Sequence, residues 1–297
     1  MKELLVSCEI CPRKCKINRY KSAGVCCASH KVKVAYYSLH MWEEPIISGE
    51  NGSGTVFFSN CNLKCILCQN KKISTLGYGK EISLQRLENI FLQLQEMGAH
   101  NINLVTPTPY VPQIIEVLKK IKNDKLKIPI VYNTSSYENV ETIKKLDNLV
   151  DVYLADFKYF DNALGQKYSK CNNYFEVASR AIEAMFNQTG SFKIEDDLLK
   201  KGVVVRILVL PGHYDDAKRI IKYLYEKYKD NIIISIMNQY TPVEDFCEYP
   251  NLNKKINEEE YNEVVNYAYD LGIVNAFIQE GDTQTESFIP DFDCNIV

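Results

Sequence analysis

The sequence contains no apolar run of the roughly 18 residues that a membrane-spanning helix needs. Its opening stretch, Met1 to Cys8, is too short and too polar for a secretory leader, so we expect none. An excess of positive charge is also absent, because 35 Lys and Arg stand against 38 Asp and Glu. That balance argues against a strongly basic nucleic-acid-binding protein. Internal repeats and low-complexity tracts are lacking too, and these absences predict a globular protein with no membrane partner.

Cysteine, in contrast, is plentiful, with 11 among 297 residues. Without a secretory leader, this number indicates the reducing cytoplasm, where spaced cysteines bind metal more often than they form disulfides. Three of them, Cys61, Cys65 and Cys68, follow an apolar run with the spacing C-x3-C-x2-C. Three thiolates can hold three irons of a [4Fe–4S] cube and leave the fourth iron open to bind a ligand. The alternatives are a zinc site completed by a histidine, or inert buried thiols, but the next histidine is His100.

A second group of cysteines lies near the start of the chain, where Cys8, Cys11, Cys15 and Cys26 supply four thiolates within about twenty residues. This group predicts a second metal site, either a structural zinc or an auxiliary Fe–S cluster, with inert thiols as a third reading. Cys27 competes with Cys26 for the fourth ligand position. The three remaining cysteines are isolated and are expected to be structural: Cys171, Cys247 and Cys294.

From about Gly54 onward, apolar β-branched runs alternate with amphipathic stretches. Six runs are predicted strands, with a weaker seventh: Thr55–Ser59, Asn101–Val105, Ile128–Thr134, Val152–Phe157, Val203–Leu210, Ile232–Asn238 and Asn275–Gln279. Helices are expected to begin near Ser83, Val111, Glu138, Tyr174, Asp215 and Asn257. The polar stretch Gly190–Gly202 is predicted to be a surface loop. Repeated βα units of this kind make a barrel, a partial barrel or an open doubly wound sheet. We expect a cysteine-rich module at residues 1–45 and an α/β domain at residues 46–297.

Catalytic residues of βα barrels lie at the carboxyl ends of the strands, and polar residues follow several of the predicted strands. Thr106 and two prolines follow the second strand, where an ordinary turn is an equally good interpretation. Asn133 and Thr134 end the third strand, where small polar side chains suit a ribose or a carboxylate. These residues are therefore candidates for ligand binding.

Charged residues emerge from two of the apolar strands. Asp156 and Lys158 are two residues apart after the fourth strand, so they share one face of an extended segment. Arg206 lies inside the apolar fifth strand, and a buried arginine needs an anionic partner. That partner is Asp156 or the carboxylate of a ligand. Charges in such positions are costly unless they are paired or functional, so we favour site residues over a simple salt bridge.

The loop Cys61–Asn70 resembles the signature of the radical S-adenosylmethionine (radical SAM) superfamily. The resemblance implies that the open iron chelates the amino and carboxylate groups of SAM, and that the reduced cluster breaks the S–C5′ bond to release a 5′-deoxyadenosyl radical. The chain is also similar to the pyruvate formate-lyase activating enzymes, in particular to their uncharacterised homologues. Six stretches carry this similarity: Cys61–Asn70, Asn101–Pro112, Pro129–Tyr137, Asp151–Asp161, Val205–Gly212 and Met237–Pro242. It favours a partial (β/α)6 TIM-type barrel.

The resemblance also implies roles for the residues at the strand ends. Asp156 and Lys158 match an Asp-x-Lys that contacts SAM and borders a monovalent-cation site in the activating enzymes. Asn133 stands where that family usually has an aspartate, so the cation site has lost a carboxylate. The pocket expected to position SAM consists of Thr106, Asn133, Thr134, Asp156, Lys158 and Arg206. No protein acid or base is expected, because the deoxyadenosyl radical itself takes the hydrogen atom.

Three functions follow from these observations. The first, implied by the resemblance, is hydrogen abstraction from a glycyl radical enzyme as protein substrate, with an electron donor such as flavodoxin or ferredoxin. The second is radical SAM chemistry on a small molecule, a peptide or RNA, because auxiliary metal sites often accompany altered chemistry. The third is a non-catalytic zinc or Fe–S binding module.

Overall fold

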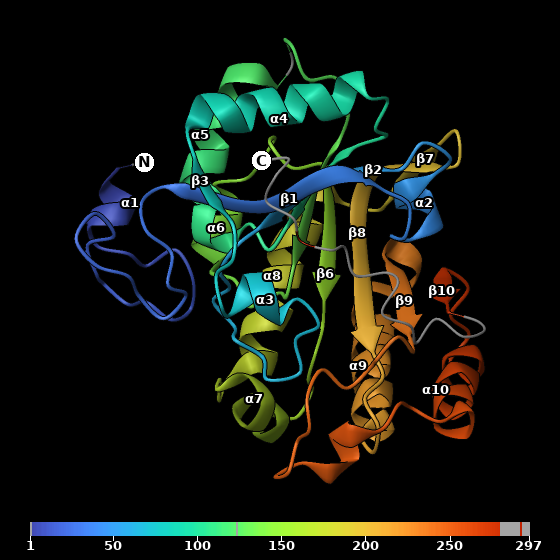
Figure 1. Cartoon of the computed structure of the whole chain (residues 1–297). Helices are drawn as coiled ribbons and strands as arrows, with labels where there is room; N and C mark the ends of the chain where they lie inside the picture. The colour runs from blue at the N-terminus through green and yellow to red at the C-terminus, as the bar shows by residue number, and fades with distance from the viewer. Residues whose placement is uncertain (1, 123, 280–291, 293–297) are drawn as a thin grey trace.

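A computed structural model of the chain describes residues 2–122, 124–279 and 292 (Figure 1). Its framework is a ten-stranded sheet in the order β10-β9-β8-β6-β5-β4-β2-β1-β3, with β7 paired to β8. Seven strands run parallel: β2 (Ser53–Phe58), β4 (Ile102–Val105), β5 (Ile130–Thr134), β6 (Val152–Asp156), β8 (Leu198–Leu208), β9 (Ile233–Met237) and β10 (Ala276–Ile278). Their order never reverses along the sheet, as in a barrel wall and unlike a doubly wound sheet. Because β10 and β3 are the two ends of the described sheet, the barrel is partial, and the predicted α/β fold class is confirmed.

Of the helices in the described chain, six begin close to residues where the sequence predicts one, and four are not predicted. The helices are α1 (Glu3–Val6), α2 (Pro45–Ser48), α3 (Lys71–Ser74), α4 (Leu84–Glu96), α5 (Val111–Ile121), α6 (Val140–Lys144), α7 (Asn162–Ser169), α8 (Tyr174–Thr189), α9 (Tyr214–Tyr228) and α10 (Glu258–Asp270). Ser83 caps α4 by accepting a hydrogen bond from the Arg86 amide at 3.0 Å, and Asn257 caps α10 in the same way from the Glu260 amide at 2.7 Å. None of the helices in the described part of the chain is long and apolar enough to cross a membrane.

Three further strands pair antiparallel with their neighbours: β1 (Val32–His40), β3 (Lys80–Ile82) and β7 (Lys193–Glu195). The sequence predicts no strand before residue 55, so β1 is a new element. The prediction of a loop at Gly190–Gly202 is wrong, because β7 and the start of β8 form a hairpin there. Asp196 and Asp197 both have positive φ, 52° and 58°, which a type I′ hairpin turn requires.

The parallel strands bury both faces. On the outer face, residues such as Tyr132 and Val203 pack against the helices, whereas Val131 and Val204, one position away along the strands, belong to an inner apolar cluster. Ile47 of α2 is fully buried in that inner cluster. Helix α2 also contacts β8 and lies beside the start of that strand (Figure 1). Therefore α2 closes the barrel at the amino ends of the strands, and Ile47→Ala would cost about 2–5 kcal/mol.

The segment before β1 carries the first cysteines and lies at the side of the molecule next to α6 (Figure 1). Two hydrogen bonds attach it there: the Thr142 hydroxyl donates to the Ile10 carbonyl at 2.6 Å, and the Asn139 amide donates to the Glu9 carbonyl at 2.7 Å. Since β1 within the first 45 residues pairs with β2, this part of the chain is joined to the sheet. The division into modules at residues 1–45 and 46–297 stays a prediction.

Candidate functional site

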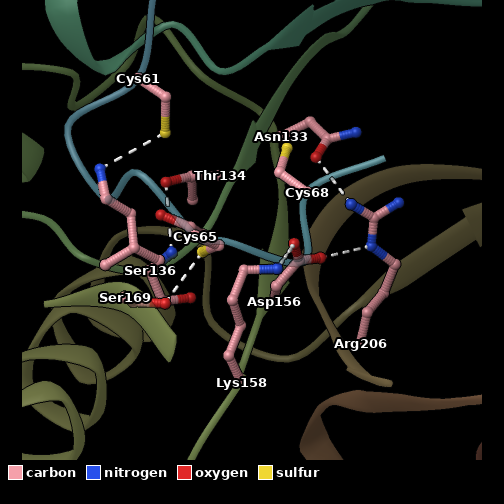
Figure 2. Close-up of polar contacts among 12 residues, drawn as sticks. Cys61, Cys65, Cys68, Asn133, Thr134, Ser136, Asp156, Lys158, Ser169 and Arg206 are labelled. Atoms are coloured by element: carbon pink, nitrogen blue, oxygen red, sulfur yellow. Dashed lines mark hydrogen bonds and ion pairs between the residues drawn. The ribbon is translucent and has the colours of Figure 1, made fainter. Parts of the chain in front are cut away.

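The cysteines Cys61, Cys65 and Cys68 lie in a loop that follows β2 and that we call the cluster loop (residues 59–70). The loop is held by its neighbours: the Asn62 amide donates to the Tyr137 carbonyl at 2.7 Å. The Cys65 thiol accepts a hydrogen bond from the Ser169 hydroxyl at 3.0 Å (Figure 2). All three sulfur-bearing side chains line one cavity. None of the three is in a disulfide.

The thiols of the cluster loop are desolvated. Burial raises the pKa of the Cys65 thiol to about 12, although the Lys158 ammonium acts in the opposite direction. Burial likewise raises the pKa of Cys61, and repulsion from Cys68 adds to this effect. Buried thiols therefore stay protonated at neutral pH unless a metal replaces the proton, since thiolate is the form that binds metal.

A charged network lies beside the cluster loop (Figure 2). Asp156, at the end of β6, accepts from the Lys158 ammonium at 2.9 Å and from the Arg206 Nε at 2.8 Å. Burial would raise the pKa of Asp156, but Arg206 and Lys158 outweigh it and hold the pKa below its ordinary value. Asp156 is therefore a carboxylate between two cations, and the predicted pairing of Arg206 with Asp156 is present.

The sequence interpretation missed Glu43 as a further partner in this network. Its carboxylate accepts from the Arg206 Nη1 at 3.0 Å and from the Asn103 amide at 2.8 Å. The Arg206 Nη2 donates to Asn133 at 2.8 Å. Glu43 lies in the turn between β1 and α2. It precedes the cavity-lining residues of β4, β5, β6 and β8 by more than 50 residues in the sequence. Because the strand β1 was not predicted, no sequence signal pointed to this position.

The remaining predicted residues also reach the cavity. Thr106 has a positive φ of 59° and donates its amide to the Asn133 carbonyl at 3.0 Å. The Thr134 hydroxyl donates to the buried carboxylate of Glu138 at 2.7 Å. Burial raises the pKa of Glu138 to about 7, and hydroxyl donors including Thr108 act in the opposite direction. The second Glu138 oxygen finds no donor among the described residues.

The cavity has a volume of about 480 Å³. It brings together the three cluster-loop cysteines and the six predicted strand-end residues: Cys61, Cys65, Cys68, Thr106, Asn133, Thr134, Asp156, Lys158 and Arg206. Glu43 and Glu44 add acidic groups, and Trp42, Phe57 and Phe277 add aromatic walls. Thiols, cations and carboxylates thus converge on one space, at the carboxyl ends and in the interior of the strands.

The other predicted metal ligands, Cys8, Cys11, Cys15 and Cys26, do not line this cavity. We call them the N-terminal cysteines. Burial raises the pKa of Cys11 to about 12, and repulsion from Cys26 and Cys8 contributes, so these thiols lie within electrostatic range of one another. In the part of the chain that the structure describes, no three Cys, His, Asp or Glu side chains are arranged to hold a single metal ion. Cys294 lies outside the described residues.

Comparison with known proteins identifies the chemistry of this arrangement. The family model of the radical SAM superfamily matches residues 55–224, which include most of β2, the cluster loop and β8. The chain belongs to the radical SAM superfamily. An uncharacterised protein of Methanocaldococcus jannaschii is 31% identical over 284 residues, which cover 92% of this chain and 78% of the relative.

Two solved structures share the radical SAM fold with this chain. Streptococcus suis SuiB, bound to the precursor peptide SuiA, has a TM-score of 0.51 and 16% identity, over 75% of this chain and 47% of SuiB. A radical SAM methyltransferase from Sphaerobacter thermophilus has a TM-score of 0.52 and 15% identity, over 76% of this chain and 66% of the methyltransferase. The chain thus spans about half the length of SuiB and about two thirds of the length of the methyltransferase. Likeness at this level of identity shows the fold alone.

The residues present fit the [4Fe–4S] cluster and SAM that the family implies. A cubane cluster takes each thiolate on a different iron atom, so its ligands stand further apart than those of a single ion. The cluster loop offers three thiols on one cavity wall, and Lys158 provides a positive charge that favours the thiolate of Cys65. The cavity continues past the thiols to Asp156 and Asn133, whose polar groups suit a ligand with a ribose and an amino acid portion.

Proposed function

We propose that this radical SAM enzyme abstracts a hydrogen atom from a protein partner, in the manner of a glycyl radical enzyme activase. The observation that carries the proposal is the shared cavity, in which the thiols of the cluster loop and the Asp156–Lys158 pair face one space. When bound, the cluster and SAM together supply a 5′-deoxyadenosyl radical. The chain's own residues bind and orient: Asp156, Lys158 and Arg206 form a preorganised charged wall, and the cavity shields the reacting atoms from water.

The partner is tested directly by electron paramagnetic resonance. Reduced, cluster-loaded protein is incubated with SAM, an electron donor such as flavodoxin or ferredoxin, and the glycyl radical enzymes of the same organism. The proposal expects a glycyl radical doublet with one of them, and no doublet when Cys65→Ala replaces the wild type. SAM cleavage without a doublet from any partner would contradict the activase function and leave the superfamily assignment standing.

A second candidate is radical modification of a small molecule, a peptide or RNA. The observation that favours it is the polar inner end of the cavity, which Glu43, Glu44 and Ser235 line. A glycine residue has no polar side chain, so its recognition would not need these polar groups. A substrate-dependent rise in 5′-deoxyadenosine with a fractionated cell extract, in the absence of any glycyl radical enzyme, would support it. A protein that carries a reducible cluster and never cleaves SAM would instead point to a non-catalytic metal-binding role.

We further propose that the N-terminal cysteines bind a second metal, a structural zinc or an auxiliary Fe–S cluster. A zinc ion would have to draw these thiols together, because no three of them surround a single ion position in the described chain. Support comes from their electrostatic contact and from Gly24, where an added Cβ would lie only 3.0 Å from the Cys15 sulfur. Cys26 interacts electrostatically with Cys8 and Cys15, whereas the side chain of Cys27 is exposed, so we propose Cys26 as the fourth ligand. Metal analysis of a Cys61→Ala/Cys65→Ala/Cys68→Ala variant tests this, because zinc or iron must remain bound to it. The reducing cytoplasm remains the predicted location.

A further inference from the structure

The inner end of the cavity holds two neighbouring glutamates in different situations. Glu43 is satisfied, because Arg206 donates to one of its oxygens and Asn103 to the other. Glu44 is only 9% exposed, and it receives a hydrogen bond from Ser235. Its Oε2 atom is buried, and no donor among the described residues reaches it. A buried carboxylate oxygen without a donor costs free energy, so this position calls for a partner.

The cations of the site are already engaged elsewhere. Arg206 donates to Asp156, Glu43 and Asn133, and Lys158 donates to Asp156. Within the described chain, no hydrogen bond or ion pair joins either cation to Glu44. Arg206 acts on Glu44 through its charge alone, against the burial that raises the pKa of this carboxyl group. Glu44 therefore lines the inner end of the cavity and has one buried carboxyl oxygen that no donor of the described chain satisfies.

The fold explains why Glu44 points inward. Pro45 begins α2, and Ile47 of that helix is fully buried in the inner apolar cluster of the barrel. The two residues before the helix are thereby carried into the end of the cavity that α2 closes. Trp42, Phe57 and Phe277 line the same cavity, so aromatic side chains and this carboxyl group face one space. An aromatic wall beside a carboxylate is a combination that attracts cationic groups.

We infer that Glu44 recognises a basic nitrogen, such as a primary ammonium group, on the substrate of this enzyme. A cation there would complete the hydrogen bonding of Glu44 and balance its charge. This inference rests on the proposed function, because it concerns the substrate of the same cavity. For a protein partner, it requires a side chain that ends in an ammonium group near the reacting glycine. For the second candidate function, it requires an amine-bearing molecule.

The test compares three probes of equal size and different charge: butylammonium, 1-butanol and butyrate. Trp42 is the only tryptophan of the chain and lines the cavity, so its fluorescence reports occupancy in cluster-loaded protein with SAM present. We expect butylammonium to bind most tightly and butyrate least. Glu44→Gln should weaken butylammonium binding about tenfold, which corresponds to about 1.4 kcal/mol, because it removes the charge from a charge-assisted hydrogen bond. Its effect on 1-butanol should be far smaller.

Two further variants keep the result interpretable. Glu116→Gln, on the exposed face of α5, makes the same chemical change away from the cavity and should leave all three affinities unchanged. Ser235→Ala removes the hydroxyl beside Glu44 and keeps its charge, so it serves if Glu44→Gln does not fold. It should weaken butylammonium binding by less than tenfold relative to the wild type and leave the order of the probes intact.

Two results would overturn the inference: equal binding of all three probes to the wild type, or an equal loss for every probe in Glu44→Gln. The probes bind without turnover, so this failure is separable from failure of the proposed function. Normal SAM cleavage activity together with no binding preference for butylammonium would refute the role of Glu44 alone. Amine binding in a protein that never cleaves SAM would refute the proposed function alone.

Discussion

The two groups of cysteines differ in what surrounds their sulfur atoms. Those of the cluster loop, Cys61, Cys65 and Cys68, open onto a cavity of about 480 Å³ beside the cation of Lys158. The N-terminal cysteines lie in a segment bonded to α6 and line no part of that cavity. Cysteines at similar spacings therefore differ in whether a metal bound to them could contact a substrate.

The number of thiols and the free space together account for the difference. Three thiols beside a cavity leave one iron of a cubane cluster accessible to SAM. Four thiols without such a cavity would complete a metal's coordination and leave nothing for a substrate, as structural sites do. Arg13 connects the two regions, because its guanidinium donates to the carbonyls of Asn62 and Leu63 in the cluster loop and to those of Ser169 and Lys170.

The charged wall that distinguishes the cluster-loop side gives the largest predicted effect. Asp156→Asn leaves Arg206 and Lys158 without their shared anion, so we expect the free energy of unfolding to fall by about 3 kcal/mol. Urea unfolding measures it. Glu141→Gln removes the partner of Lys144 in an exposed ion pair and should cost less than about 1 kcal/mol. Equal losses in the two variants would contradict the account of the wall.

Glu138 lies between the two regions and gives the second effect. Glu138 accepts hydrogen bonds from the hydroxyls of Thr108 and Thr134, which line the cavity. Its charge also raises the pKa of Cys11 in the N-terminal group of cysteines. Its own pKa is raised by burial from 4.5 to about 7, so as pH rises through this interval the unfolded chain loses the proton first. Stability from this group is full below about pH 4.5, and about 3 kcal/mol is lost by pH 8.

Glu138→Gln keeps the shape of the protonated acid and should remove this pH dependence. Urea unfolding at pH 5 and pH 8 measures the slope for the variant, the wild type and Glu116→Gln, which should behave like the wild type. If the Glu138→Gln protein loses as much stability as the wild type between the two pH values, the interpretation of Glu138 as a buried acid is wrong.

Arg13 offers a way to separate the two regions. Arg13→Ala removes its four hydrogen bonds and should lower the free energy of unfolding by about 2 kcal/mol. Arg13→Lys keeps the charge without the planar fork and should recover only part of the loss. Calorimetry and the iron content of the cluster loop provide the measurements. Normal stability and iron content in Arg13→Ala would show that the two regions are independent.

The smallest effect is expected at Cys27. Its side chain is exposed, and its sulfur lies 3.8 Å from the Lys64 ammonium. Cys27→Ser should therefore change stability by no more than about 0.5 kcal/mol and leave the metal content unchanged. Cys26→Ser is the matched comparison and should lose the second metal. The reverse result would exchange the two assignments.

Much of the fold could be predicted because buried parallel strands can be recognised from the apolar residues of the strand itself. Apolar runs such as Val203–Leu210 and caps such as Ser83 depend on neighbouring residues, and the structure places them close to where the sequence predicts. β1 was missed because it mixes buried with half-buried positions and has no clean alternation. The sequence does not reveal the hairpin turn at Asp196 and Asp197, because a run of charged residues is typical of a surface loop, although aspartate also tolerates the positive φ of a hairpin turn.

The candidate site was predictable to the same extent. Asp156 and Lys158 follow directly from a strand and its end, so local sequence reveals them. Glu43, Glu44 and Arg13 act across large separations in the chain, and nothing near them in sequence shows what they contact. Only the tertiary fold, in which α2 closes the barrel, brings the two glutamates to the cavity.

The most direct test of the central claim is SAM cleavage in three proteins. Wild type, Cys65→Ala and Cys11→Ser are reconstituted with iron under anaerobic conditions, reduced with dithionite and given SAM, and 5′-deoxyadenosine and methionine are measured by chromatography. The account predicts cleavage by the wild type and by Cys11→Ser, and none by Cys65→Ala. Cleavage by Cys65→Ala, or its absence in a Cys11→Ser protein with a loaded cluster loop, would contradict the assignment of the chemistry to Cys61, Cys65 and Cys68.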